Sequence, residues 1–157
     1  MRRKQSVWPW SLAIVVAIAG AATLIWAMQP SAAAELVVYK MPTCGCCRLW
    51  VNHARASGFT IRAVDVADLS EIKKQHNIPL HLSACHTAVG SGYVFEGHIP
   101  ADTIRRFLKE RPAAAGLIVA GMPVGSPGME GPTPQPYDIL LLERDGRTRV
   151  YEHRGVR

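Results

Sequence analysis

The sequence predicts an α/β domain, and three observations support this fold class. Short apolar runs typical of strands alternate with stretches whose apolar residues recur at helical spacing. Hydrophobic residues make up 48% of the 157-residue chain, which is enough for one core. A segment rich in glycine and proline then precedes a last pair of predicted strands. We therefore expect one compact domain with appendages.

The N-terminal segment has the pattern of an export signal. Residues 2–4 are basic, residues 12–27 are apolar and uncharged, and small residues at 31–34 offer a cleavage site before Glu35. We expect residues 1–34 to be a signal peptide and the mature protein to be periplasmic. The alternative is an uncleaved anchor in the inner membrane, because the apolar run approaches the ~17 residues that span a bilayer.

The charge distribution does not suggest a nucleic-acid partner. The formal net charge is +6, but three of these charges belong to residues 2–4, so the remainder of the chain carries +3. Its basic residues are scattered singly or in pairs rather than gathered in a stripe. No nucleic acid is expected as a partner, and a membrane is expected only if the N-terminal segment stays uncleaved.

The first four predicted elements alternate between strand and helix. Residues 35–40 predict a buried strand, and residues 48–57 predict a helix that Thr43 caps and Gly58 ends. Alternating apolar residues at 59–66 predict the second strand. A short helix follows to about His76, with Asp68 in its cap position.

A hairpin and a helix complete the expected order. Residues 82–89 and 93–96 read as strands around a Gly-Ser-Gly turn, and a helix begins near Pro100 and ends before Pro112. The order strand, helix, strand, helix, hairpin, helix is that of the minimal thioredoxin-like fold, βαβαββα. We assign it to residues 35–111.

Residues 112–157 form a predicted C-terminal extension packed on the same domain. Its Gly/Pro-rich loop, residues 121–136, carries Met122 and Met129 and is longer than a simple connection requires. A β-hairpin with an Asp-Gly turn follows. We expect the loop to lie across the cysteine-bearing end of the first helix.

Three of the four cysteines lie within Cys44-Gly45-Cys46-Cys47, at the junction of the first strand and helix. A helix N-terminus favours thiolate over thiol, but thiolates are both nucleophiles and soft-metal ligands. Cys46 and Cys47 cannot pair, since adjacent Cα atoms lie ~3.8 Å apart, closer than the ~4.4 Å that a disulfide needs. A Cys44–Cys47 bridge is feasible, but it leaves Cys46 and Cys85 unexplained.

The fold brings the fourth cysteine to the other three. In the thioredoxin-like order, the loop entering the third strand lies beside the start of the first helix and usually carries a cis-proline. Here that position holds Cys85 and His86, which each supply a ligand atom, and this favours metal binding over disulfide exchange. Soft thiolates select Cu(I), with zinc or an iron–sulfur cluster as rivals. We hypothesise a thiolate-bridged copper cluster on Cys44, Cys46, Cys47 and Cys85.

Further ligands are expected around these cysteines. His86 is either a ligand or a strand histidine bonded to backbone, and His98 is equally well explained by a structural role. Met122 and Met129 gain little from packing in a Gly/Pro loop, so they are candidate copper ligands or an entry gate. Met41 is expected to pack in the core rather than to bind metal.

Several motifs resemble the CopG-type family of periplasmic metal-binding proteins. The resemblance covers essentially the whole mature chain and departs from the family pattern at the turn residues 90–91. It implies copper binding and copper resistance, with copper ions and other periplasmic copper-handling proteins as partners. The similar stretches are residues 39–47, residues 83–89, residues 92–100, Gly121-Met122-Pro123 and Gly128-Met129-Glu130.

The sequence thus favours an exported copper-binding protein over an enzyme, and leaves open a redox step between Cu(I) and Cu(II). The alternative is a periplasmic thiol-disulfide oxidoreductase that uses Cys44 and Cys47 as its reactive pair. That alternative explains neither Cys46 nor Cys85. A zinc-stabilised structural module ranks third, because no second pair of closely spaced cysteines exists.

Overall fold

The computed structural model describes residues 34–155, so the predicted signal segment, apart from Ala34, lies outside the described residues. Within this range no helix is long and apolar enough to cross a bilayer. The elements are, in chain order, β1 (Glu35–Lys40), α2 (Gly45–Ala56), β2 (Thr60–Asp65), α3 (Ser70–Gln75), the 3-10 turn η1 (Leu80–Leu82), β3 (His86–Gly90), β4 (Tyr93–Glu96), α4 (Ala101–Glu110), β5 (Gly116–Ile118), β6 (Tyr137–Leu142) and β7 (Thr148–Arg154).

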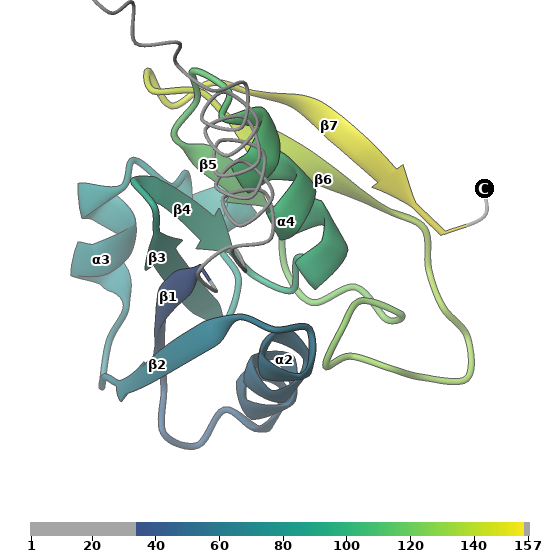
Figure 1. Cartoon of the computed structure of the whole chain (residues 1–157). Helices are drawn as coiled ribbons and strands as arrows, with labels where there is room; N and C mark the ends of the chain where they lie inside the picture. The colour runs from purple at the N-terminus through teal and green to yellow at the C-terminus, as the bar shows by residue number, and fades with distance from the viewer. Residues whose placement is uncertain (1–33, 156–157) are drawn as a thin grey trace, which may run out of the picture. The chain divides into compact units, whose positions relative to one another are not determined.

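The elements from β1 to α4 confirm the thioredoxin-like fold class. β1 pairs with β2 in parallel and with β3 antiparallel, and β3 and β4 form the expected hairpin. The helix α2 connects the two parallel strands, and α4 follows the hairpin (Figure 1). The predicted element order and hairpin of this core are therefore correct.

The extension contains a strand that the sequence analysis did not predict. β5 lies parallel to β4, and β6 and β7 follow it, so the sheet has the order β2-β1-β3-β4-β5-β6-β7. β5 begins at Gly116, where an added Cβ would collide with the Val94 carbonyl of β4, so the close approach requires glycine. A three-residue strand flanked by alanine and glycine gives little periodic signal. The division at residue 112 between the core fold and the C-terminal extension stays a prediction.

The sheet has an apolar core on each face. Alternate residues of β4, β5 and β6 point to opposite faces, as the period of a strand requires. Figure 1 shows α3 on the other side of β3 and β4 from α4. One core joins α2 and α4 to the sheet through Trp50, Ile104, Phe107, Phe95, Leu117 and Leu141, and the other joins Ile78 to Val94, Ile118 and Leu142.

Candidate metal centre

The start of α2 positions three cysteines at the end of β1. The helix begins at Gly45, earlier than predicted, and its N-cap is Cys44, whose Sγ accepts the Cys47 N–H at 3.3 Å. The prediction that Thr43 caps the helix is wrong, because the Cys44 sulfur takes that role. Cys47 is buried while Cys44 and Cys46 are half-buried.

A disulfide joins Cys44 to Cys47, with a Cα–Cα distance of 5.4 Å. This is the pairing that the spacing made feasible. Cys46 and Cys85 remain as free thiols. The structure therefore represents the oxidised protein, in which two of the four sulfurs are unavailable as thiolates.

The loop before β3 brings Cys85 against the helix start, as the fold predicted. The Sγ atom of Cys46 lies 3.5 Å from that of Cys44 and 3.7 Å from that of Cys85. The four cysteine sulfurs all lie within 4.8 Å of one another. A thiol-disulfide oxidoreductase that uses Cys44 and Cys47 gives Cys46 no role. The Cys46 sulfur contacts the sulfur of Cys44 at the helix start and that of Cys85 in the loop before β3.

The spacing of these sulfurs suits a bound metal. Two sulfurs bound to one tetrahedral metal at ~2.3 Å lie ~3.8 Å apart. The Cys46 Sγ is 3.7 Å from the Cys85 Sγ and 3.9 Å from the Met122 Sδ, close to that value in both cases. Two thiols and a thioether are soft donors, so the donor set fits a soft metal.

His98 faces Cys85 with a defined ring nitrogen. Its Nδ1 lies 2.8 Å from the Pro127 carbonyl oxygen, and because a carbonyl only accepts, Nδ1–H must donate. Burial lowers the pKa of His98, so the ring is neutral near pH 7 and Nε2 carries a lone pair. This Nε2 lies 3.0 Å from the Cys85 Sγ. Metal-binding histidines commonly donate their other nitrogen to a carbonyl in this way.

The proximity of His98 to Cys85 has a signal in the sequence. Thr87 pairs with Glu96 in the β3–β4 hairpin, so the same register extended two residues outward places Cys85 opposite His98. The predicted hairpin therefore implies that Cys85 and His98 are close, once the register of its two strands is known.

His86 is completely buried beside the same cysteine. Its Nδ1 lies 3.5 Å from the Cys85 Sγ, and its ring lies 4.5 Å from that of Trp50 and 4.9 Å from that of His98. Within residues 34–155 its Nε2 has no hydrogen-bond partner, so His86 stays a candidate ligand. Burial, followed by the charges of His98 and Lys73, lowers the pKa of His86 well below its ordinary value. His86 is therefore a neutral donor next to Cys85.

The environment of Cys85 opposes ionisation. Burial, followed by the neighbouring Cys46 sulfur, raises the pKa of the Cys85 thiol to about 12. At neutral pH the Cys85 S–H is thus protonated and donates to His98 Nε2. A cation that binds here has to displace this proton, so metal binding is coupled to proton release.

The Gly/Pro-rich loop lies over the cysteine-bearing start of α2, as predicted. An added Cβ at Gly128 would lie 2.8 Å from the Cys46 carbonyl oxygen and from the Trp50 nitrogen, so this contact requires glycine. The Met122 Sδ lies 3.9 Å from the Cys46 Sγ, and Met122 is 50% exposed. The loop therefore contributes a partly exposed sulfur to the cluster.

Met129 and Met41 differ from Met122. The hydrogen bonds of Met129 seen within residues 34–155 are made by its backbone, to Gly125 and Ser126. Met41 is 43% exposed, so the prediction that it packs in the core is wrong. Among the methionines of residues 34–155, Met122 has the sulfur that the structure places against a cysteine.

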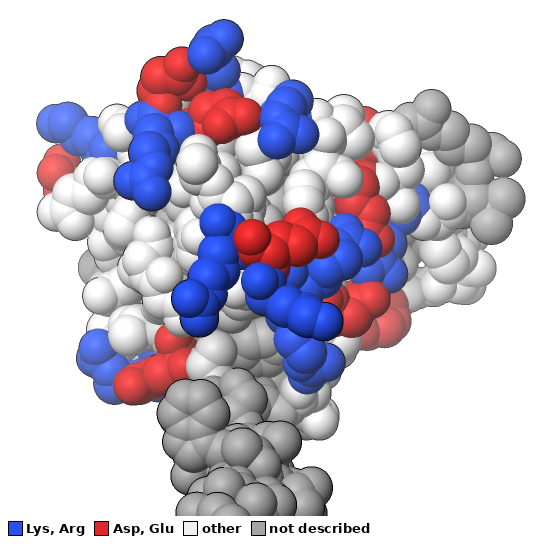
Figure 2. Space-filling model, turned by 45° about the horizontal axis from the view of Figure 1, so that its top comes forward, with Lys and Arg blue, Asp and Glu red and all other residues white. Residues whose placement is uncertain are grey.

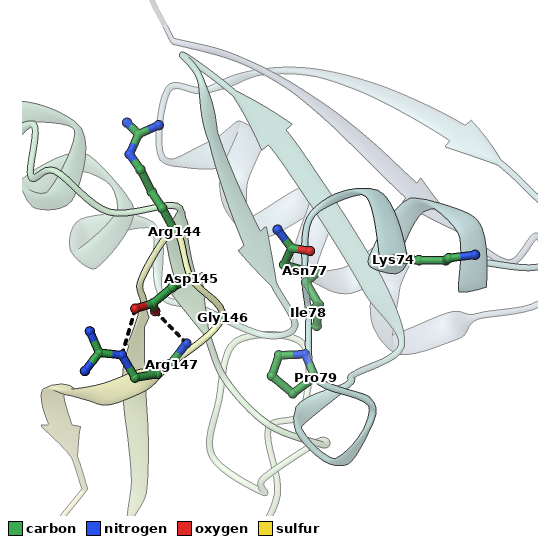
Figure 3. Close-up of a pocket in the computed structure, with 8 residues that line it drawn as sticks. All are labelled: Lys74, Asn77, Ile78, Pro79, Arg144, Asp145, Gly146 and Arg147. Carbon is green, nitrogen blue, oxygen red and sulfur yellow. Dashed lines mark hydrogen bonds and ion pairs between the residues drawn. The ribbon is translucent and has the colours of Figure 1, made fainter.

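A second concave region lies between the end of α3 and the β6–β7 turn (Figure 3). Arg147 is paired with Asp145 at 2.7 Å, while Lys74 and Arg144 point away from one another. None of its lining residues is a cysteine, methionine or histidine. This pocket offers no converging donors, unlike the cysteine cluster.

Basic side chains elsewhere on the surface are interspersed with acidic ones. Figure 2 shows Lys and Arg beside Asp and Glu on the face that it presents. Arg106 pairs with Glu152 at 2.7 Å, and Arg154 pairs with Asp102 at 2.7 Å. The absence of a nucleic-acid partner stays a prediction, but these basic residues already have acidic partners.

Comparisons with known proteins give a consistent result. Residues 82–129 match a family described as protein of unknown function, DUF411. A solved structure titled copper resistance protein CopG, form 2, is 37% identical with a TM-score of 0.74, and the match covers 78% of this chain and 99% of that chain. Form 1 is 38% identical with a TM-score of 0.72, covering 76% and 96% respectively. A search of curated proteins finds no match.

Proposed function

This chain belongs to the CopG-type family of copper resistance proteins, and from that membership we propose that it is an exported copper-binding protein. Its cargo is Cu(I), bound by the thiolates of Cys44, Cys46, Cys47 and Cys85. This binding lowers the concentration of free copper, and copper-handling proteins of the same compartment are the partners that deliver or receive the ion. Zinc is the less favoured metal.

The observation that carries this proposal is the convergence of the four cysteine sulfurs. Three of the sulfurs belong to residues 44–47, and the fourth belongs to Cys85, which follows Cys47 by 38 residues. All four lie within 4.8 Å of one another. Ordinary packing or disulfide stapling does not require four sulfurs in contact. Crowded thiolates suit Cu(I), a soft ion, and a sulfur with neighbours on two sides, such as that of Cys46, suits a bridging position in a polynuclear site.

Other donors surround the thiolates. His98 presents its Nε2 lone pair and Met122 its thioether, whereas His86 lies deeper against Trp50. We assign His86, His98 and Met122 as supporting ligands, and Met129 as a weaker candidate in the same loop. Donors on the partly exposed side, such as Met122, give copper a route into the site.

The full site forms only after reduction. The Cys44–Cys47 disulfide takes up two electrons and two protons from a dithiol reductant, which becomes a disulfide itself, and yields two thiols. The thiols then lose their protons as Cu(I) binds. The oxidised protein retains Cys46 and Cys85 as its free cysteines and is expected to bind less copper.

Metal analysis of the anaerobic protein tests the proposal. After reduction and loading, elemental analysis should give more than one copper per chain, and X-ray absorption should show copper–sulfur and copper–copper distances. One zinc per chain, or no metal, would contradict the proposal. The oxidised protein, handled identically, is the matched control and should bind less copper.

One observation favours a second function. The Cys44–Cys47 disulfide joins a half-buried N-cap sulfur to a buried one at a helix start, an arrangement suited to thiol–disulfide exchange. The reaction would transfer two electrons from these thiols to a substrate disulfide. Robust insulin reduction by the metal-free protein would favour this oxidoreductase over the copper carrier.

A further inference from the structure

A buried ion pair lies directly behind the loop that carries Cys85. Lys73 of α3 and Glu96 at the end of β4 form a salt bridge, with side chains that are 8% and 0% exposed. Buried charges are uncommon in proteins, and such a pair rarely adds net stability compared with an apolar pair of similar volume. Net stabilisation therefore does not explain why this pair is buried behind the Cys85 loop.

The ion pair holds both backbone groups of Ala84. Glu96 Oε1 accepts the Ala84 N–H at 2.6 Å, and Lys73 Nζ donates to the Ala84 carbonyl oxygen at 3.0 Å. Ala84 is the residue immediately before Cys85. The backbone direction at the fourth cysteine is thus fixed by two charge-assisted hydrogen bonds.

The pair is itself anchored on the sheet. The Thr87 hydroxyl donates to Glu96 Oε2 at 2.6 Å, so both carboxylate oxygens are occupied. Thr87 and Glu96 are paired residues of β3 and β4. The chain before β3 is therefore tied to the rigid hairpin and not to a mobile part of the surface.

The loop that carries Cys85 is also in close contact with Gly97, on the chain that follows β4. Gly97 donates its N–H to the His86 carbonyl at 3.0 Å, and an added Cβ at Gly97 would lie 2.7 Å from the Ala84 Cβ. Ala84 and Cys85 are thus enclosed between the ion pair and the chain that leads to His98. In this fold a proline usually occupies the corresponding loop, and here charged side chains hold it instead.

We propose that Lys73 and Glu96 are positioning residues of the copper site, which hold Ala84 so that the Cys85 sulfur stays within binding distance of Cys46. The inference rests on the proposed function. It adds two residues that do not touch the metal, since neither is within the cysteine cluster. Because the pair is neutral as a whole, it fixes the loop without adding net charge beside the thiolates.

A variant that replaces the whole network by apolar side chains tests the proposal. Lys73→Met/Thr87→Val/Glu96→Leu leaves no buried charge without a partner, so the fold should be retained. Amide hydrogen exchange at Ala84 and Cys85 in the metal-free protein should rise by at least about tenfold, while that of the β1 and β4 amides is unchanged. Cu(I) affinity, measured against a chromophoric chelator, should fall by about 10–100-fold.

The single variant Thr87→Val is the matched control. It removes the hydrogen bond to Glu96 and the longer one from Lys73 at 3.5 Å but leaves both bonds to Ala84, so it should lower the melting temperature while Cu(I) affinity stays within about twofold. Equal affinity losses in the control and the triple variant would indicate a purely structural role and overturn the proposal. Unchanged exchange and affinity in the triple variant would do the same.

Failure of the proposed function and misfolding of the triple variant can both be told apart from failure of this inference. If the wild-type protein fails to bind Cu(I), the proposed function is wrong, yet hydrogen exchange of the metal-free protein still decides whether the pair holds the loop. If the triple variant does not fold, Lys73→Met/Glu96→Leu, which keeps Thr87, is measured in the same way. It removes both side-chain bonds to Ala84 without leaving a buried charge unpaired, and unchanged exchange at Ala84 in that variant would overturn the proposal.

Discussion

The two cysteine-bearing regions of the candidate site are held in different ways. Cys44, Cys46 and Cys47 lie within four residues at one helix start, where the N-cap and a disulfide fix them locally. Cys85 lies in a loop that is held by contacts from distant parts of the chain. Those contacts come from Lys73, Glu96 and His98.

The difference separates two properties of the site. The helix-start region can change its oxidation state, because reduction of its disulfide yields two thiols. The Cys85 region is held by hydrogen bonds with Lys73, Glu96 and His98, and the high pKa of its thiol keeps it protonated near neutral pH. The helix-start region thus sets how many thiolates are available, and the Cys85 region sets where the four sulfurs meet.

The largest expected effect is the pH dependence of Cys85 alkylation. The pKa of Cys85 is raised to about 12, so its thiolate fraction grows about tenfold per pH unit below that value. Alkylation of Cys85 in the oxidised, metal-free protein should rise about a thousandfold from pH 7 to pH 10 without a plateau. Peptide mapping by mass spectrometry measures it separately from Cys46.

The unfolded protein is the control for this measurement. Its Cys85 pKa should return to about 8.5, so its alkylation rate should level off near pH 9. A folded-state pKa above the unfolded value means that Cys85 stabilises the metal-free fold below pH ~8.5 and loses this contribution as pH rises toward 12. A plateau near pH 8.5 in the folded protein would show that Cys85 is exposed to water and not held as described.

The next largest effect is expected for Cys46→Ser. The Cys46 sulfur contacts both regions, so its loss should lower Cu(I) affinity by at least about a hundredfold, more than the loss of an outer-shell group. Thiol–disulfide exchange by Cys44 and Cys47 should be nearly unchanged. Chelator competition and insulin reduction measure the two properties on the same sample. Unchanged Cu(I) affinity together with robust exchange in this variant would favour the oxidoreductase that uses Cys44 and Cys47.

The helix-start region was largely predictable from the sequence because its geometry is local. The spacing of Cys44, Cys46 and Cys47 and the adjacent helix pattern placed all three at the junction of the first strand and helix. The error was in the cap, since the sequence offered Thr43 and the structure uses the Cys44 sulfur. Side-chain oxygens are the usual caps, and composition alone does not reveal a sulfur in that role.

The Cys85 region was predictable only in part because tertiary contacts build it. Topology placed Cys85 beside the other cysteines, but the positions of Lys73 and Glu96 carry no local signal of a buried ion pair. A lysine in a short helix and a glutamate at a strand end usually face solvent. β5 was missed for a related reason, since Gly116 is suited to close contact with β4 and has weak strand propensity.

The smallest expected effect concerns the methionines of the Gly/Pro-rich loop, which connects to both regions. Met122 places its sulfur 3.9 Å from Cys46 but is 50% exposed, so Met122→Leu should weaken Cu(I) binding only about two- to fivefold. Met129→Leu is the matched control, because it makes the same chemical change in the same loop at a residue whose hydrogen bonds run through its backbone. Chelator competition at one pH compares them. Equal losses would show that the loop sulfurs act together as a gate, whereas a larger loss at Met129 would mean that the loop rearranges when copper binds.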